Sequence, residues 1–335
     1  MTDSSSSREP GRARVRRIAC AALVLCGLAA GAACAQANYP ARPVRIVLPF
    51  GPGGVTDITA RLLAQRLTDA LKQQVIIDNR PGAGGIVATE LARKAEPDGH
   101  TIMWLTTGHA LAVALFKSLP YDPVRDFAPV STVGFFALAL VVSGESPVKS
   151  VPALIAAVKV NPARFNFAIT NIGSSHHLCS ELFKYMTGLP AQIVPFKTTP
   201  ALVSALRSGE AQAAFEFISP VLPHLKSGAL RALAVTSAKR FAGLPDIPTV
   251  AEAGLPGFDV SAWNGTAVPA KTPRRVIDRL NREVNAALAA PEMKQRLQEL
   301  GIEARPGTPE GLRDLLAAEI AKWTAVVDKA KIERQ

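Results

Sequence analysis

Three glycine-bearing loops, each placed between a short β-branched run and a helical pattern, constrain the fold of this chain most strongly. They cover residues 50–57, 79–85 and 170–176. Strands that alternate with helices predict a parallel sheet with right-handed crossovers. Loops in this context lie at the carboxyl edge of the sheet, where open α/β folds bind ligands. The pattern therefore predicts both an α/β fold and a binding edge.

Short apolar runs bounded by turn residues predict the strands, and apolar residues at helical spacing predict the helices. The expected strands cover residues 44–48, 75–77, 101–105, 165–169, 192–196, 211–217 and 230–235. A first helix is expected after the 50–57 loop, with Thr56 or Asp57 as its cap. Further helices are expected near residues 86–94, 152–159, 176–187, 200–207 and 220–226, and C-terminal helices near 277–288 and 312–327.

Two longer segments with strand character, residues 131–142 and 258–268, connect the halves of this pattern. A chain that builds half a lobe, crosses, builds a second lobe and returns forms two domains with a cleft and two hinge strands. We therefore expect domain 1 to contain residues 38–137 and 260–335, and domain 2 to contain residues 138–259. The mature length is sufficient for two such cores.

The first 37 residues have the composition of a secretory signal peptide. A cluster of arginines precedes an apolar stretch at residues 18–33, and Ala35 and Ala37 both end a small-x-small cleavage site. We expect cleavage after one of these alanines and a periplasmic mature protein. Of the four cysteines in the chain, only Cys179 then remains, and its apolar neighbours predict a core position rather than a nucleophile.

Charge and motifs exclude several classes of function. The formal net charge is +11, and the remaining Lys and Arg are scattered after the signal peptide, which favours anionic small molecules or solubility over nucleic acid. No dinucleotide fingerprint, P-loop or hydrolase elbow occurs in the sequence. His176 and His177 are adjacent, so on a helix they point about 100° apart and cannot easily share a metal. The sequence therefore predicts a binder rather than an enzyme, with no metal and no cofactor.

Glycine loops ahead of helices present backbone N–H groups and the positive end of the helix dipole, which favour an anion such as a carboxylate. Turn formation by the glycines is the alternative at each loop. Helix capping is the alternative for Thr56 and Asp57, and surface solvation is the alternative for Lys197 and Glu216 at strand ends. Trp104 and Trp263 are expected in the core. On these grounds alone, the binding and structural interpretations both stay open.

Several motifs then point to a known family. Residues 39–47 (YPARPVRIV), 49–54 (PFGPGG), 79–85 (NRPGAGG) and 244–250 (LPDIPTV) resemble the Bug (TctC-type) substrate-binding proteins, the extracytoplasmic receptors of tripartite tricarboxylate transporters. The resemblance covers nearly the whole mature chain. It implies a two-lobed periplasmic-binding-protein fold of type II that closes on a carboxylate, partly through ordered water.

The family's binding pattern falls on both lobes of this chain. In the first lobe it implies ligand contacts at Phe50, Gly53, Gly54, Thr56, Asp57, Asn79, Ala83, Gly84 and Thr107. In the second lobe it implies contacts at Gly173, Ser174 and His177. Departures from the pattern add Asn171 and Ile172, where glycine and a polar residue are usual, and Lys197 and Glu216, the latter in place of the usual Asp.

The resemblance predicts a monomeric receptor that captures a small carboxylate for the membrane subunits of a tripartite tricarboxylate transporter. Two alternatives are the same binder serving a sensor kinase or acting without a transporter, and a periplasmic enzyme. Ile172 beside a shortened loop at residues 195–201 favours a monocarboxylate with an apolar body, because burying an unpaired second charge is costly. If these residues lie outside the cleft, an ordinary dicarboxylate is expected instead.

Overall fold

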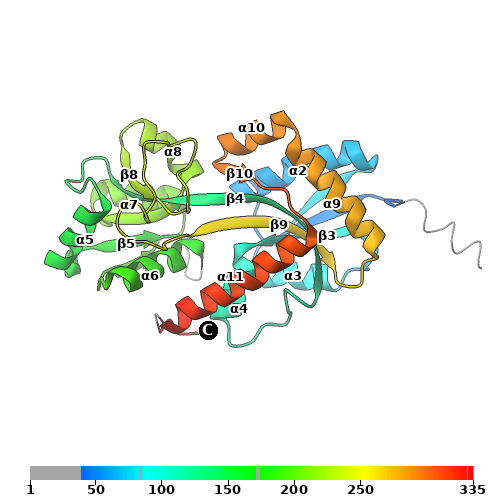
Figure 1. Cartoon of the computed structure of the whole chain (residues 1–335), viewed down its shortest axis with the longest axis horizontal. Coiled ribbons are helices and arrows are strands. Elements are labelled where there is room, and N and C mark those ends of the chain that lie inside the picture. The colour runs from blue at the N-terminus through cyan, green and yellow to red at the C-terminus, as the bar shows by residue number, and fades with distance from the viewer. Residues whose placement is uncertain (1–38, 83–84, 171–173, 330, 335) are drawn as a thin grey trace, which may run out of the picture. The chain divides into compact units, whose positions relative to one another are not determined.

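The computed structural model describes residues 39–82, 85–170, 174–329 and 331–334. Residues 42–335 form one compact unit (Figure 1). The first elements alternate as expected: β1 (Val44–Leu48), α2 (Val55–Leu71), β2 (Val75–Asn79), α3 (Ile86–Arg93), β3 (Thr101–Thr106) and α4 (Thr107–Leu115). β1 pairs in parallel with both β2 and β3, so the carboxyl ends of these strands lie at one edge of the sheet.

The long strand β4 (Phe127–Ser143) joins two sheets. Up to Ala137 it pairs antiparallel with β9 (Ser261–Pro269), which in turn pairs with β3. From Leu138 onward it pairs instead with β7 (Ala213–Phe217) and β8 (Leu230–Val235). The two segments that the sequence suggests as connectors are therefore a continuous strand and its antiparallel partner.

The second lobe repeats the alternation of strands and helices. Its elements are α5 (Val151–Val160), the 3₁₀ helix η2 (Pro162–Arg164), β5 (Asn166–Ile169), α6 (Ser175–Thr187), β6 (Gln192–Pro195), α7 (Thr199–Ser208), β7, α8 (Ile218–Lys226) and β8. β5 pairs in parallel with β6 and β7. In Figure 1 this lobe lies at one end of β4 and β9, and the lobe of β1–β3 lies at the other. The expected two-lobed α/β fold is confirmed.

The C-terminal elements return to the first lobe. They are α9 (Arg274–Ala289), α10 (Pro291–Glu299), β10 (Ile302–Ala304) and α11 (Pro309–Lys329). α11 packs on α4 and β4, and it also meets α6 of the second lobe. Trp323 of α11 is fully buried, as are Trp104, Trp263 and Cys179, so the expected core positions of these last three residues are confirmed.

Thr236 ties together the two segments that cross between the lobes. Its backbone N–H donates to the Leu138 carbonyl at 2.9 Å, and its hydroxyl donates to the Val260 carbonyl at 2.6 Å. The Val260 N–H donates back to the Thr236 carbonyl at 2.8 Å. These bonds lie where β4 changes partners and where the chain returns to β9. The division into domains at 137/138 and 259/260 stays a prediction.

Some local features differ from the expectations. The N-cap of α2 is Gly54, because the Ile58 N–H already bonds to the Gly54 carbonyl, so the expected cap at Thr56 or Asp57 was wrong. Helix α4 was not expected, since its residues are apolar almost all round and give no amphipathic stripe. β10 is a strand of 3 residues, too short for a periodic signal. Within the described residues, no helix is long and apolar enough to cross a membrane.

Candidate ligand-binding site

The loop between β1 and α2 presents the start of a helix to solvent. Gly53 has a φ of +87°, a left-handed conformation that favours glycine, and Gly54 is extended at φ −78° and ψ 167°. Among the described residues, no side chain caps this helix. The N–H groups of Val55 and Thr56 precede that of Ile58, which is the first to donate within the helix, so they have no acceptor inside the helix and can donate to an outside group. Phe50 on the same loop is 45% exposed.

Asp57 organises this loop from within. Its carboxylate accepts hydrogen bonds from the Gly53 N–H at 2.9 Å, the Arg61 Nε at 2.9 Å and the Asn79 Nδ2 at 3.0 Å. Asn79 also donates to the Phe50 carbonyl at 2.9 Å. Asp57 is only 2% exposed, and burial alone would raise its pKa, but these hydrogen bonds outweigh burial and hold the pKa below its ordinary value. Asp57 is therefore a buried anion that shapes the loop.

The second glycine loop follows β2 and leads into α3. The Arg80 N–H donates to the Leu48 carbonyl at 2.8 Å, so the ends of β1 and β2 are joined where their loops begin. Gly85 caps α3 with a φ of +95°, and a side chain there would come within 3.1 Å of Pro49. The structure thus brings the first two loops together, as the sequence predicts. The predicted contacts Ala83 and Gly84 lie outside the described residues.

The third strand ends in a tightly bonded helix start. The Thr107 hydroxyl is buried and accepts a hydrogen bond from the Trp263 N–H at 2.8 Å, which ties α4 to β9. The Thr106 N–H donates to Nδ1 of His109 at 3.1 Å, and Nε2 lies 3.2 Å from the Thr89 hydroxyl. Burial lowers the pKa of His109 to about 4, so the ring is neutral at pH 7 and its proton is assigned to Nε2. The predicted ligand contact of Thr107 stays a prediction.

In the second lobe, α6 starts at a side-chain cap. The Ser174 hydroxyl accepts from the His177 N–H at 3.3 Å. Both Ser174 and His177 belong to the predicted site, and burial lowers the pKa of His177, which lies 3.8 Å from Glu181. The predicted contacts Asn171, Ile172 and Gly173 lie outside the described residues.

A buried carboxylate also lies at the end of β7. Glu216 is 1% exposed and accepts from His176 Nε2 at 2.7 Å, from the Phe217 N–H at 2.8 Å and from the Thr199 hydroxyl at 3.1 Å. Glu216 is therefore not a solvated surface residue. Lys197, predicted at the end of another strand of this lobe, is exposed. The sequence reasoning named His177 but missed His176, and the spacing of adjacent histidines gave no reason to choose between them.

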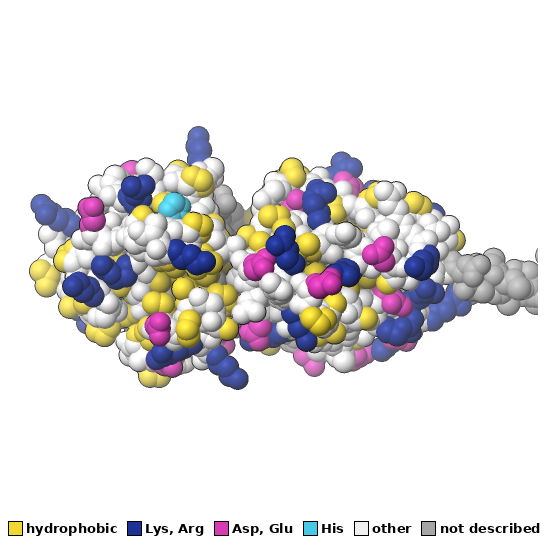
Figure 2. Space-filling model, turned by 90° about the horizontal axis from the view of Figure 1, so that it is seen from above, with side chains coloured by type: hydrophobic (Ala, Val, Ile, Leu, Met, Phe, Trp, Pro, Cys, Tyr) yellow, Lys and Arg dark blue, Asp and Glu magenta, His cyan; other side chains and the backbone are white. Residues whose placement is uncertain are grey.

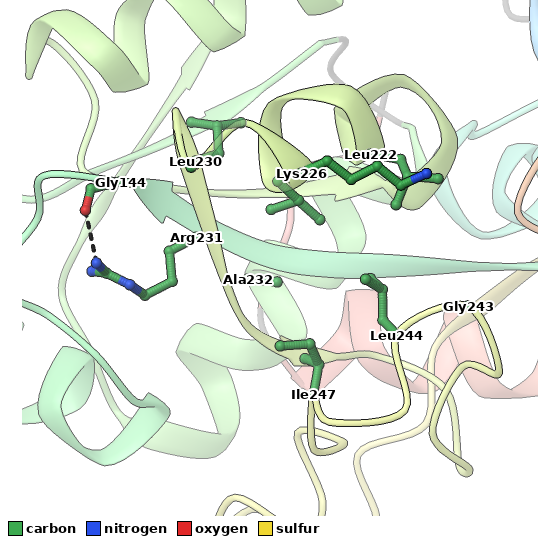
Figure 3. Close-up of a pocket in the computed structure, with 11 residues that line it drawn as sticks. Gly144, Leu222, Lys226, Leu230, Arg231, Ala232, Gly243, Leu244 and Ile247 are labelled. Carbon is green, nitrogen blue, oxygen red and sulfur yellow. Dashed lines mark hydrogen bonds between the residues drawn. The ribbon is translucent and has the colours of Figure 1, made fainter.

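Two hollows differ in character. Figure 2 shows a groove between the two lobes, on the face seen there. A separate cavity of about 480 Å³ lies within the second lobe, beside α8 and β8 (Figure 3). Its walls are mostly apolar, for example Leu222 and Leu244, and the Arg231 guanidinium at one end donates to the Gly144 carbonyl at 2.8 Å. None of the predicted site residues that the structure describes lines this cavity, so it is distinct from the described part of the candidate site.

The described residues at the candidate site offer hydrogen-bonding and charged groups to a ligand. Within the described ranges, no group of three or more His, Cys, Asp or Glu side chains could hold a metal. Burial raises the pKa of the Cys179 thiol well above its ordinary value, so this thiol is a poor nucleophile. In the first lobe, the site has a helix start without a side-chain cap, beside the ion-paired carboxylate of Asp57. In the second lobe, it has the helix start capped by Ser174 and the buried pair of Glu216 and His176.

Comparison with known proteins shows the family to which this chain belongs. The model of the family described as "Tripartite tricarboxylate transporter family receptor" (TctC) matches residues 59–332. The chain is 39% identical over 292 residues to the protein BugT of Bordetella pertussis, covering 87% of this chain and 90% of BugT. It is 38% identical over 290 residues to a UPF0065 protein of Pseudomonas sp. strain P51, with 86% of both chains covered.

Solved structures agree with this result. R. palustris Rpa4515 with adipate superposes with a TM-score of 0.80 at 36% identity, covering 89% of this chain and all of the other. MatC of Rhodopseudomonas palustris with bound malate gives a TM-score of 0.76 at 34% identity, covering 86% of this chain and all of the other. The periplasmic binding protein BugD gives 0.78 at 33% identity, covering 89% of this chain and all of BugD. The chain therefore belongs to the TctC, or Bug, family of periplasmic solute-binding proteins.

Proposed function

We propose that this protein captures a small carboxylate-bearing molecule between its two lobes and presents it to the membrane subunits of a tripartite tricarboxylate transporter. One observation carries the proposal: the start of α2 has no side-chain cap, and the only carboxylate in its first turn, Asp57, is already bonded to three donors. A helix start of this kind favours an anion as its partner.

The relatives support the chemical class of the ligand. Two similar structures, both more than 30% identical to this chain, contain adipate and malate. Each of these acids carries carboxylate groups that could rest on backbone N–H groups. We infer that this chain binds an acid by the same kind of contact, without turning it over.

We assign different tasks to the two lobes. The loops of the first lobe, with Phe50, Gly53, Gly54 and Asn79, hold one carboxylate. The loops of the second lobe, around Ser174 and His177, read the rest of the ligand. Closure about the crossing strands, near Thr236, brings the two sets of loops together.

The leader at residues 1–37 supports export to the periplasm, where the members of this family bind their ligands. We infer that the mature chain acts there as a monomer. Its partners are then a small acid and the membrane subunits of a transporter.

A thermal-shift screen tests the proposal. The panel contains adipate, succinate, malate, citrate, benzoate and nicotinate, each beside its neutral amide as a control. An acid at a hundred times its dissociation constant adds about 2.7 kcal/mol of stability, which raises the melting temperature by roughly 4 °C for a folded chain of about 300 residues. We expect at least one acid to give such a shift and its amide to give none. A flat response to every acid, or equal responses to acids and amides, would count against a carboxylate receptor.

A further inference from the structure

Arg61 is a residue that neither the sequence motifs nor the family pattern assigned to the site. It lies on α2, one turn after Asp57, and the two side chains form an ion pair with Nε 2.9 Å from Oδ2. The Arg61 side chain is 52% exposed, whereas the Asp57 side chain is 3% exposed. A second contact, from the Arg61 guanidinium to Asn79 Oδ1 at 3.2 Å, connects α2 to the end of β2.

The position of Asp57 raises an electrostatic problem for an anion receptor. Asp57 lies in the first turn of α2, where its own negative charge interacts favourably with the helix dipole. A second anion at the same helix start would meet the repulsion of a like charge close by, and such repulsion is weakly screened where one partner is buried. The site can accept an anionic ligand only if the charge of Asp57 is offset.

Arg61 supplies the offsetting charge from the side of the helix. Together with Ala64 and Gln65 of α2, it lines a surface recess whose opposite wall is residues 75–77 of the edge strand β2. The guanidinium therefore reaches Asp57 from the side of α2 that faces β2. Its bond to Asn79 Oδ1 also turns the Asn79 amide N–H groups toward Asp57 and the Phe50 carbonyl.

We propose that Arg61 is a positioning residue for ligand binding: it neutralises Asp57 and fixes Asn79, so that the loop at residues 50–54 can accept a carboxylate. This inference rests on the proposed function. It also explains why a buried carboxylate can lie beside a site for anions.

Isothermal titration with adipate, malate and benzoate tests this role in four variants. Arg61→Gln removes the charge but keeps a hydrogen-bonding side chain, and Arg61→Lys keeps the charge. Arg42→Gln is the matched control. Arg42 forms an exposed ion pair with Asp98 just before β1 begins, at the end of the strands opposite to the candidate site. The double variant Asp57→Asn with Arg61→Gln removes both charges at once.

For each acid that the wild-type protein binds, we expect Arg61→Gln to weaken binding at least about tenfold, while Arg42→Gln and Arg61→Lys stay within about threefold of wild type. The double variant should recover most of the affinity lost in Arg61→Gln, because it removes the like charge. A purely structural role would give no such recovery. Unchanged affinity in Arg61→Gln, or no recovery in the double variant, overturns the inference. Failure of the wild-type protein to bind any acid of the thermal-shift panel overturns the proposed function itself.

Discussion

Replacing Gly54 by valine separates binding from folding more cleanly than any other change in the first loop. The backbone at Gly54 is extended, with φ −78° and ψ 167°, so any residue can adopt it. A Cβ built there meets no described atom within 4 Å. Substitution at an N-cap position that makes no side-chain bond costs at most about 1 kcal/mol. The variant should therefore fold with nearly the stability of the wild-type protein.

The effect on binding should be much larger. A carboxylate oxygen must approach a backbone N–H to about 2.9 Å, and the methyl groups of valine at position 54 would stand in that approach. Loss of one such contact, or its replacement by a longer one, weakens binding at least about tenfold, or about 1.4 kcal/mol. Calorimetric titration with the acids that stabilise the wild-type protein measures the affinity, and urea unfolding measures the stability.

A second glycine gives the comparison. Gly53→Ala places a side chain at a φ of +87°, which costs about 1–3 kcal/mol of strain, and Gly209→Ala imposes similar strain at φ +81° at the end of α7. We expect both to lose stability, but only Gly53→Ala to lose affinity as well. Wild-type affinity in a folded Gly54→Val protein would refute the placement of the carboxylate at this loop.

Three further predictions concern the second lobe, pH and closure. Glu216→Ala should cost about 3–5 kcal/mol of unfolding free energy in urea, because it leaves His176 and two other donors without their buried acceptor, whereas Glu216→Gln keeps an acceptor and should cost about 1–2 kcal/mol; equal losses would argue against this network. Burial lowers the pKa of His109 from 6.5 to about 4 in the folded protein. The unfolded chain therefore takes up a proton at this residue first, so the unfolding free energy is highest above about pH 6.5 and falls by roughly 3 kcal/mol as the pH drops toward 4. His109→Gln should flatten this part of the stability profile, and an unchanged slope would contradict the assignment. Small-angle scattering should show a smaller radius of gyration with saturating acid, and an unchanged radius at proven saturation would rule out closure.

The sequence was sufficient for the fold because local pattern and tertiary structure agree. β1 and β3 are buried, mostly apolar runs, β2 begins with three β-branched residues, and turn residues bound all three, so their strand character needs no long-range information. The sequence was less informative for α4, whose residues are buried on nearly every side. It was also less informative for the course of β4, because the change of pairing partner at Leu138 depends on strands far away in the sequence.

For the site, the motifs placed Asp57 and Asn79 on two loops at the same end of the sheet, and the structure joins the two side chains by a hydrogen bond, while their contact with a ligand stays a prediction. Asp57 proved to be bonded within its own loop, so it organises the loop rather than capping the helix. His176 was missed because its partner Glu216 lies far along the chain. Arg61 was missed although its ion pair with Asp57 has the i,i+4 spacing of a helix, and its contact with Asn79 depends on the fold.

The most direct test of the central claim is a crystal structure of the protein with the acid that gives the largest thermal shift. We predict that one carboxylate group of this acid lies between the lobes, with an oxygen about 3 Å from the N–H of Val55 or Thr56, or joined to it by one water. Arg61 and Asp57 should remain paired beneath it. An acid found in the second-lobe cavity of Figure 3, or with its carboxylate away from residues 50–57, would contradict the account.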